Sequence, residues 1–171
     1  MKTRLVIYLF IFFATTALGR YFAINYSYAD FKSYTDVLLN VSGAVFTLMG
    51  IWIAFLYPNA LSRIVDPKTI ETADFSESFL ESKRLTAIVG SVMKSAAVVL
   101  GVLVMTFLKL PISALPSLME HKLELKHVGL GAALTLLVLQ SEAIFGVIYA
   151  NVMFLNDLHT KRAEKMLEDQ Y

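Results

Sequence analysis

The stretch LTAIVGSVMKSAAVVLGVLVMTFL, residues 85–108, carries a single charge, Lys94. At about 1.5 Å of rise per residue, a helix over these residues is long enough to cross the roughly 30 Å apolar core of a bilayer. No polar face recurs every turn along it, as it would on a helix of a soluble bundle. The stretch therefore predicts a membrane-spanning helix, and a charge inside such a helix is a candidate functional residue.

Three further stretches follow the same pattern. Residues 127–156 contain one formal charge, Glu142, and residues 37–62 and 5–19 contain none. We predict an all-α, multi-pass fold in which residues 1–171 form one four-helix transmembrane domain. The expected spans are about residues 5–23, 37–57, 85–110 and 128–155, with Pro58 and Pro111 ending the second and third. Residues 59–84 are then a loop and residues 156–171 a tail.

The composition excludes several classes of protein. The chain is 57% hydrophobic. Its 15 basic residues are balanced by 14 acidic ones, so the sequence lacks the excess of basic charge that is typical of nucleic-acid-binding proteins. It has no cysteine, and so no disulfide or thiolate metal site. The N-terminus resembles a secretory signal ending near Gly19, but its aromatic run favours an uncleaved first helix.

Lysine and arginine counts predict the orientation of the chain. Nine basic residues fall on the side of the two termini and five on the other. We therefore expect both termini in the cytoplasm. Residues 20–34, which hold four of the eight tyrosines, are expected to lie along the outer headgroups. Residues 111–127 are expected to form a short surface helix.

Small residues at three- and four-residue steps mark helix faces that permit close packing in lipid. They are Gly43, Thr47, Gly50 and Ala54 in the second span, Gly90, Ala97 and Gly101 in the third, and Gly146 and Ala150 in the fourth. Lys94 lies on the third-span face and Glu142 on the fourth. We expect a homo-oligomer, taken as a tetramer, that packs through the second and third spans.

The depths of the two charges allow them to pair. Lys94 lies about 15 Å along its helix from Arg84, and Glu142 lies about 22 Å from Asp157. Three interpretations are open: a structural ion pair within or between subunits, a ring of charges lining an oligomeric pore, and proton coupling in a transporter. The ion pair is favoured because an unpaired charge at this depth costs roughly 2.5–3.5 kcal/mol.

The cytoplasmic segments carry mixed charges at helical spacing and are expected to hold a cytoplasmic protein partner. Asp74-Phe75-Ser76-Glu77 has the spacing of a capping box and predicts a helix that leads into the third span. The candidate partner-binding residues are Arg63, Asp66, Asp74, Glu77, Glu81, Lys161, Arg162 and Lys165.

No phosphate loop, metal-ligand spacing or nucleophile–base pair occurs in the sequence, so we expect no enzyme, cofactor or metal site. Two classes of function remain. One is a membrane scaffold or sensor that recruits a cytoplasmic partner, and the other is a small ion channel or membrane-perturbing effector formed by oligomerisation.

The second span, residues 40–58, followed by a mixed-charge loop, resembles small four-span proteins of bacterial phage-defence loci. The arrangement of spans is similar to the KwaA family, the membrane subunit of the Kiwa anti-phage system. The resemblance implies a homotetramer that senses phage attack at the inner membrane, with DNA binding left to a cytoplasmic partner.

Overall fold

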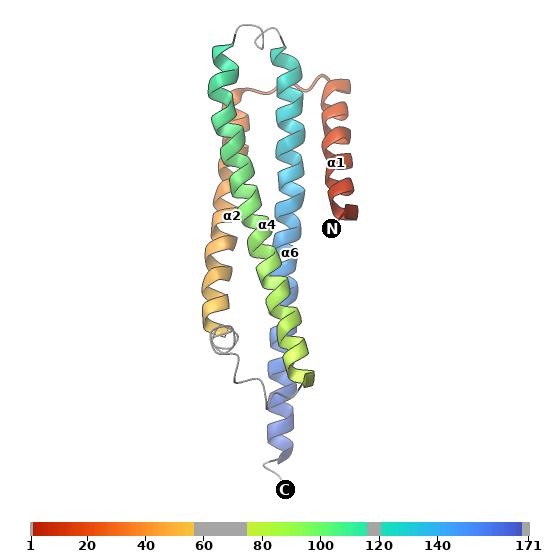
Figure 1. The fold of residues 1–171 in the computed structure, drawn as a ribbon, viewed down its shortest axis with the longest axis vertical. Coiled ribbons are helices and arrows are strands. Elements are labelled where there is room, and N and C mark those ends of the chain that lie inside the picture. The colour runs from red at the N-terminus through yellow and green to blue at the C-terminus, as the bar shows by residue number, and fades with distance from the viewer. Residues whose placement is uncertain (1, 57–74, 116–120, 169–171) are drawn as a thin grey trace. The chain divides into compact units, whose positions relative to one another are not determined.

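The computed structural model describes residues 2–56, 75–115 and 121–168. Its elements are four helices: α1 (Lys2–Tyr21), α2 (Tyr28–Leu56), α4 (Phe75–Ala114) and α6 (Lys122–Glu168) (Figure 1). Each contains a stretch long and apolar enough to cross a membrane: Thr3–Tyr21, Tyr28–Ala54, Leu85–Ile112 and Lys122–Asp157. The prediction of an all-helical fold with four such helices is confirmed.

Helix α1 ends in a Schellman motif, in which two backbone amides beyond the helix bond back to its last turn. The amide of Ile24 donates to the carbonyl of Gly19 at 3.1 Å, and the amide of Ala23 donates to the carbonyl of Arg20 at 3.2 Å. Ala23 consequently has a φ of 49°, a left-handed conformation that usually favours glycine. This motif ends α1 two residues before the predicted end of the first span.

Helix α2 starts nine residues before the predicted second span, because residues 27–30 form a capping box. The Ser27 hydroxyl accepts a hydrogen bond from the amide of Asp30 at 3.1 Å, and the Ser27 amide donates to Asp30 Oδ2 at 2.9 Å. One turn later Lys32 forms an ion pair with Asp36 at 2.6 Å. The residues expected to lie along the headgroups are therefore helical from Tyr28 onward.

Helix α4 also differs from its prediction, because it includes Pro111 and ends at Ala114. A proline removes one backbone hydrogen bond, and so close to the end of a helix only the last turn is affected. The described parts of residues 111–127 belong mostly to the ends of α4 and α6, and no separate surface helix occurs within them. The start of α4 at Phe75 agrees with the predicted helix leading into the third span.

The helices contribute to two compact units, each with its own small core. The first unit comprises Met1–Ala44 and Lys94–Ser141, and the second comprises Val45–Met93 and Glu142–Tyr171. In the first unit Leu38, Val98 and Val102 are buried, and in the second Met49, Ile88 and Ala150 are buried.

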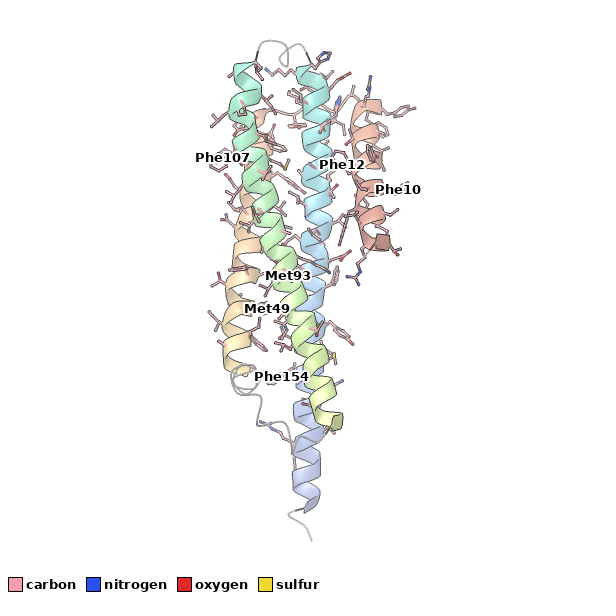
Figure 2. The ribbon with its side chains drawn as sticks, in the orientation of Figure 1. Phe10, Phe12, Met49, Met93, Phe107 and Phe154 are labelled. Carbon is pink, nitrogen blue, oxygen red and sulfur yellow. The ribbon has the colours of Figure 1, made fainter. Side chains whose placement is uncertain are left out.

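Many large apolar side chains lie outside these cores. Phe10 and Phe107 are 73% and 67% exposed, and Figure 2 shows them standing out from their helices. Such exposure would be a liability in water, but it suits a protein whose solvent is hydrocarbon.

Candidate functional site

A buried polar layer lies next to the apolar core of the first unit. Ser42 of α2 and Gln140 of α6 are 0% and 2% exposed. The Ser42 hydroxyl lies 2.8 Å from Gln140 Oε1 and 2.7 Å from the Leu38 carbonyl oxygen of its own helix. A hydrogen bond between two helices is a recognised means of holding membrane helices together.

The Ser42 hydroxyl carries one hydrogen and cannot donate to both acceptors. Gln140 Nε2, in turn, has no hydrogen-bond partner among the described residues. If the Gln140 amide turns over, Nε2 can donate to the Ser42 oxygen while Ser42 donates to Leu38. Either orientation of the Gln140 amide is thus compatible with a bond to Ser42, and each leaves part of the amide without a partner in the described chain.

Ser95 of α4 belongs to the same layer. It precedes the buried Val98 by three residues, Ser42 follows Leu38 by four, and α4 runs opposite to α2 and α6 (Figure 1). These steps place Ser42 and Ser95 one turn from the apolar core, and Gln140 belongs to the layer through its bond to Ser42. Ser95 is fully buried, and its hydroxyl has no hydrogen-bond partner among the described residues. Lys94 was predicted as a site residue because it is the single charge of the third span. Its neighbour Ser95, which was not predicted, is the more buried of the two.

The two predicted intramembrane charges are both half-buried. Lys94 is the first residue of α4 that belongs to the first unit, and Glu142 is the first residue of α6 that belongs to the second unit. Their pairing stays a prediction. Ser141, the residue before Glu142, donates its hydroxyl to the Leu137 carbonyl at 2.9 Å.

A polar clamp joins the α1–α2 linker to the start of α6. Lys126 Nζ donates to Asn25 Oδ1 and to the Tyr26 carbonyl, each at 2.8 Å, and the Tyr26 hydroxyl donates back to the Lys126 carbonyl. Burial raises the pKa of the Tyr26 phenol above its ordinary value, which keeps it protonated as a donor. Close by, Arg20 and Glu124 form an exposed ion pair at 3.6 Å.

Aromatic residues near the clamp make specific contacts, and their expected location along the headgroups stays a prediction. The Tyr26 ring stacks on Phe31 with centroids 5.9 Å apart, and Lys109 Nζ lies 3.0 Å from the centre of the Tyr28 ring. His127, one residue after Lys126, is buried, with 4% of its surface exposed. These residues hold together the end of the first unit where α1 ends and α6 begins.

The glycines of the predicted packing faces fall into two groups. A β-carbon at Gly101 would lie 2.8 Å from Leu136 Cδ2, and one at Gly146 would lie 2.3 Å from Ser91 Oγ. Both contacts join α4 to α6 within one chain. A β-carbon at Gly43, Gly50 or Gly90 would meet no atom of the described residues within 4 Å.

The remaining residues of these faces divide in the same way. Ala150 is buried in the second core, whereas Thr47, Ala54 and Ala97 are exposed. Among the described residues, nothing therefore packs closely on the small-residue positions of α2.

A close contact between α1 and α6 was not predicted. A β-carbon at Gly131 of α6 would lie 2.1 Å from Thr16 Oγ1 of α1 and 3.1 Å from the Phe12 carbonyl oxygen. The sequence signal was present in Gly129-Leu130-Gly131, since glycine in an apolar helix marks close backbone approach.

The predicted partner-binding residues lie only partly within the described chain. Arg63, Asp66 and Asp74 are outside the described residues. Glu77 and Glu81 belong to the first turns of α4, and Lys161 and Lys165 to the last turns of α6. Arg162 is exposed on α6.

The described residues contain no group of three or more His, Asp or Glu that could hold a metal ion. The arrangement that they do contain, a buried amide with two serines between apolar helices, can exchange hydrogen bonds but offers no nucleophile–base pair. Comparisons with family models, with curated proteins and with solved structures found no match for this chain.

Proposed function

We propose that this chain is a non-enzymatic, multi-pass scaffold or sensor of the bacterial inner membrane that assembles as a homo-oligomer and holds a cytoplasmic protein. The observation that carries the proposal is the length of α4 and α6. Helix α4 begins at Phe75, although its apolar stretch starts at Leu85, and α6 runs to Glu168, although its apolar stretch ends at Asp157. Each helix therefore continues about 15 Å past its apolar stretch.

These two extensions belong on the same side of the membrane. When four helices cross in succession, the start of the third and the end of the fourth share the side of the N-terminus. The excess of lysine and arginine on that side supports a cytoplasmic location. Both extensions belong to the second unit, whose core reaches Leu85 and Trp52, and Trp52 packs edge-on against Phe154.

The charges on the extensions indicate what they could bind. Residues 75–84 carry two glutamates and two basic residues, and residues 158–168 also carry both acidic and basic residues. A mixed surface of this kind suits a polar, salt-sensitive contact with a protein, whereas binding to anionic lipid favours a purely basic cluster.

The open small-residue faces support assembly. A β-carbon added at Gly43 or Gly50 of α2 would have no neighbour within 4 Å in the part of the chain that the structure describes, so another helix can approach these positions closely. We propose that a second copy does so, and that a tetramer closes the assembly. The resemblance to KwaA makes anti-phage defence the first process to test.

The test is affinity purification of the full-length chain after co-expression with soluble proteins encoded beside its gene. We expect one of them to co-purify at low salt and to be lost at high salt. Arg162→Glu, on the α6 extension, should weaken its retention. Lys122→Glu, an exposed lysine at the opposite end of the same helix, should not. Absence of any such protein, or equal loss with both variants, contradicts the proposal.

The second candidate function is an ion channel, and the half-burial of Lys94 and Glu142 favours it. Charges that remain partly exposed on a single chain could line a pore built by several copies. A channel should conduct when the purified protein is reconstituted alone, and Glu142→Gln should reduce the conductance. Conductance by the purified protein alone would contradict the scaffold proposal and support the channel.

A further inference from the structure

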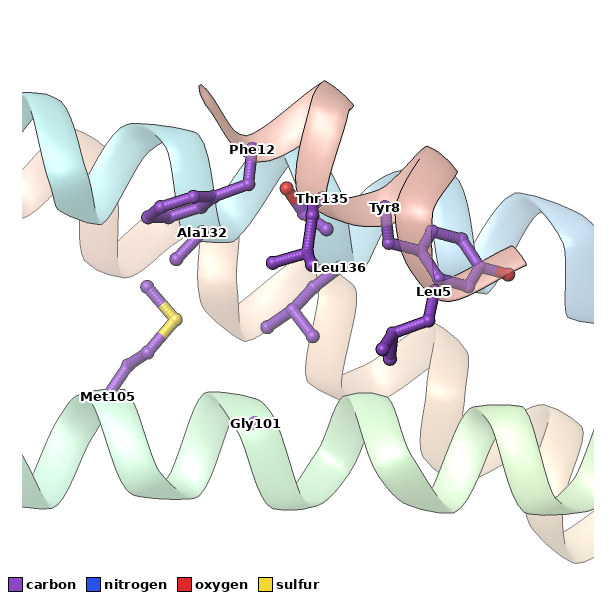
Figure 3. A pocket seen from close by; sticks show the side chains of 9 residues that line it. Leu5, Tyr8, Phe12, Gly101, Met105, Ala132, Thr135 and Leu136 are labelled. Carbon is purple, nitrogen blue, oxygen red and sulfur yellow. The ribbon is translucent and has the colours of Figure 1, made fainter. Parts of the chain in front are cut away.

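An apolar groove with a volume of about 320 Å³ lies among α1, α4 and α6 of the first unit (Figure 3). Its walls include Leu5, Leu9 and Phe12 of α1, Gly101 and Met105 of α4, and Leu136 of α6. Leu5 and Leu9 are 63% and 49% exposed, so the α1 wall can be reached from outside the protein.

Next to the groove, α1 packs closely against α6 along its second half. There Thr16 touches the backbone at Gly131, and Gly19 lies against His127. In the first half of α1 the facing positions are small: Gly101 has no side chain and Ala132 has only a methyl group, and both line the groove. Leu136 fills part of the space beside Gly101, where a β-carbon would lie 2.8 Å from it.

The walls are suited to hydrocarbon rather than to water. Thr135 is the polar side chain of the α6 wall, and its hydroxyl already donates to the Gly131 carbonyl at 2.8 Å. A water molecule needs two to four polar partners, and apolar cavities stay dry while accepting apolar ligands. In a bilayer, the available apolar ligand is a lipid acyl chain.

The position of the groove along α1 selects one leaflet. From Leu5 to Phe12 the groove follows α1 for about 10 Å, within the roughly 15 Å thickness of one leaflet's apolar layer. Its end at Leu5 is next to Arg4, which is exposed and shares a helix face with Tyr8 of the groove wall. Because side chains on a helix lean toward its N-terminus, the Arg4 guanidinium is directed to the headgroup region beyond the groove.

We propose that this groove binds an anionic phospholipid, with one acyl chain against Leu5, Leu9 and Phe12 and the phosphate on Arg4. Charge complementarity at the end of the groove selects an anionic lipid, and the apolar walls hold its chain. The inference requires α1 to span the membrane, but it requires neither a cytoplasmic partner nor a particular oligomer.

The test is native mass spectrometry of the purified full-length protein, delipidated and then supplied with phosphatidylglycerol or with phosphatidylcholine of the same chain length. We expect more retained phosphatidylglycerol. Arg4→Gln should lower its retention about fivefold, the effect of one basic residue at a membrane surface, and should lower the retention of phosphatidylcholine less, because the choline cation offsets its phosphate charge. Arg20→Gln is the matched control at the other end of α1 and should have little effect.

A second pair of variants tests the acyl-chain site. Ala132→Phe fills the groove and should lower the retention of both lipids, whereas Ala17→Phe, an exposed position of α1 outside the groove, should change neither. Met105→Phe serves the same purpose from the α4 wall if Ala132→Phe fails to fold, as judged by helicity and elution volume. Wild-type retention by a folded groove-filling variant, or equal retention of the two lipids by the wild type, would overturn the proposal.

Discussion

Gly131 of α6 lies so close to Thr16 of α1 that a β-carbon at position 131 would fall 2.1 Å from the Thr16 hydroxyl oxygen. The Thr16 hydroxyl donates to the Phe12 carbonyl at 2.8 Å, so the side chain has a fixed place in the contact. Because lipid gives helices little hydrophobic reason to associate, this close approach is a main source of the attraction between α1 and α6.

We predict that Gly131→Ala destabilises the protein by about 1–3 kcal/mol, the usual cost of an overpacked contact. Adding Thr16→Ala should recover part of the loss, because it removes the nearest atom. Gly90→Ala is the control, since a β-carbon there meets none of the described residues within 4 Å. Thermal unfolding in one detergent compares the three variants. A Gly131→Ala protein as stable as the wild type would show that α1 does not pack here.

Gln140→Leu should change the stability by less than about 1 kcal/mol, because it removes a buried Nε2 without a partner in the described chain and leaves Ser42 bonded to Leu38. Gln140→Ala should cost about 2 kcal/mol or more, since it also leaves a cavity. The same unfolding assay measures both. Equal losses for the two variants would mean that the amide makes a further bond that stabilises the fold.

The clamp predicts a pH dependence. The pKa of the Tyr26 phenol is raised in the folded chain, so its stabilisation is complete below the unfolded value near 10 and is lost as the pH rises through the folded value. Tyr26→Phe should be less stable than the wild type by about 1 kcal/mol at neutral pH. That difference should shrink in strongly alkaline solution. If the difference in stability between Tyr26→Phe and the wild type stays constant in alkaline solution, Tyr26 is not the titrating group.

Lys94 and Glu142 are predicted to be energetically coupled. Each single charge reversal creates a like-charged pair, and the cost of a charge in the membrane is roughly 2.5–3.5 kcal/mol. The double variant with Lys94→Glu and Glu142→Lys should recover much of the loss. A double-variant loss equal to the sum of the two single losses would mean that the residues act independently.

The positions of the four apolar helices could be predicted because charge is nearly absent from long stretches of the chain. The start of α2 could have been predicted as well, since Ser27 and Asp30 have capping-box spacing, but the following tyrosines favoured a headgroup segment. Pro111 was expected to end α4 immediately, whereas a proline near a helix end leaves the preceding turns intact.

The site was less predictable than the helices. Helical periodicity shows that Gly43 and Gly101 lie on small-residue faces, but it does not show that Leu136 covers one of them. The bond between Ser42 and Gln140 joins residues 98 positions apart, and nothing in the local pattern pairs them. Long-range contacts of this kind depend on which helices become neighbours, and the spacing within each helix does not specify that.

The membrane placement is tested most directly by labelling single cysteines, because the chain has none of its own. Two exposed positions on α6 or next to it are suitable for the label. His121 comes directly before α6, and His159 lies in the last turns of α6. A membrane-impermeant maleimide added to intact spheroplasts should label His121→Cys and should label His159→Cys only after the membrane is opened. Labelling of His159→Cys in intact spheroplasts would contradict the four-span topology with both termini inside.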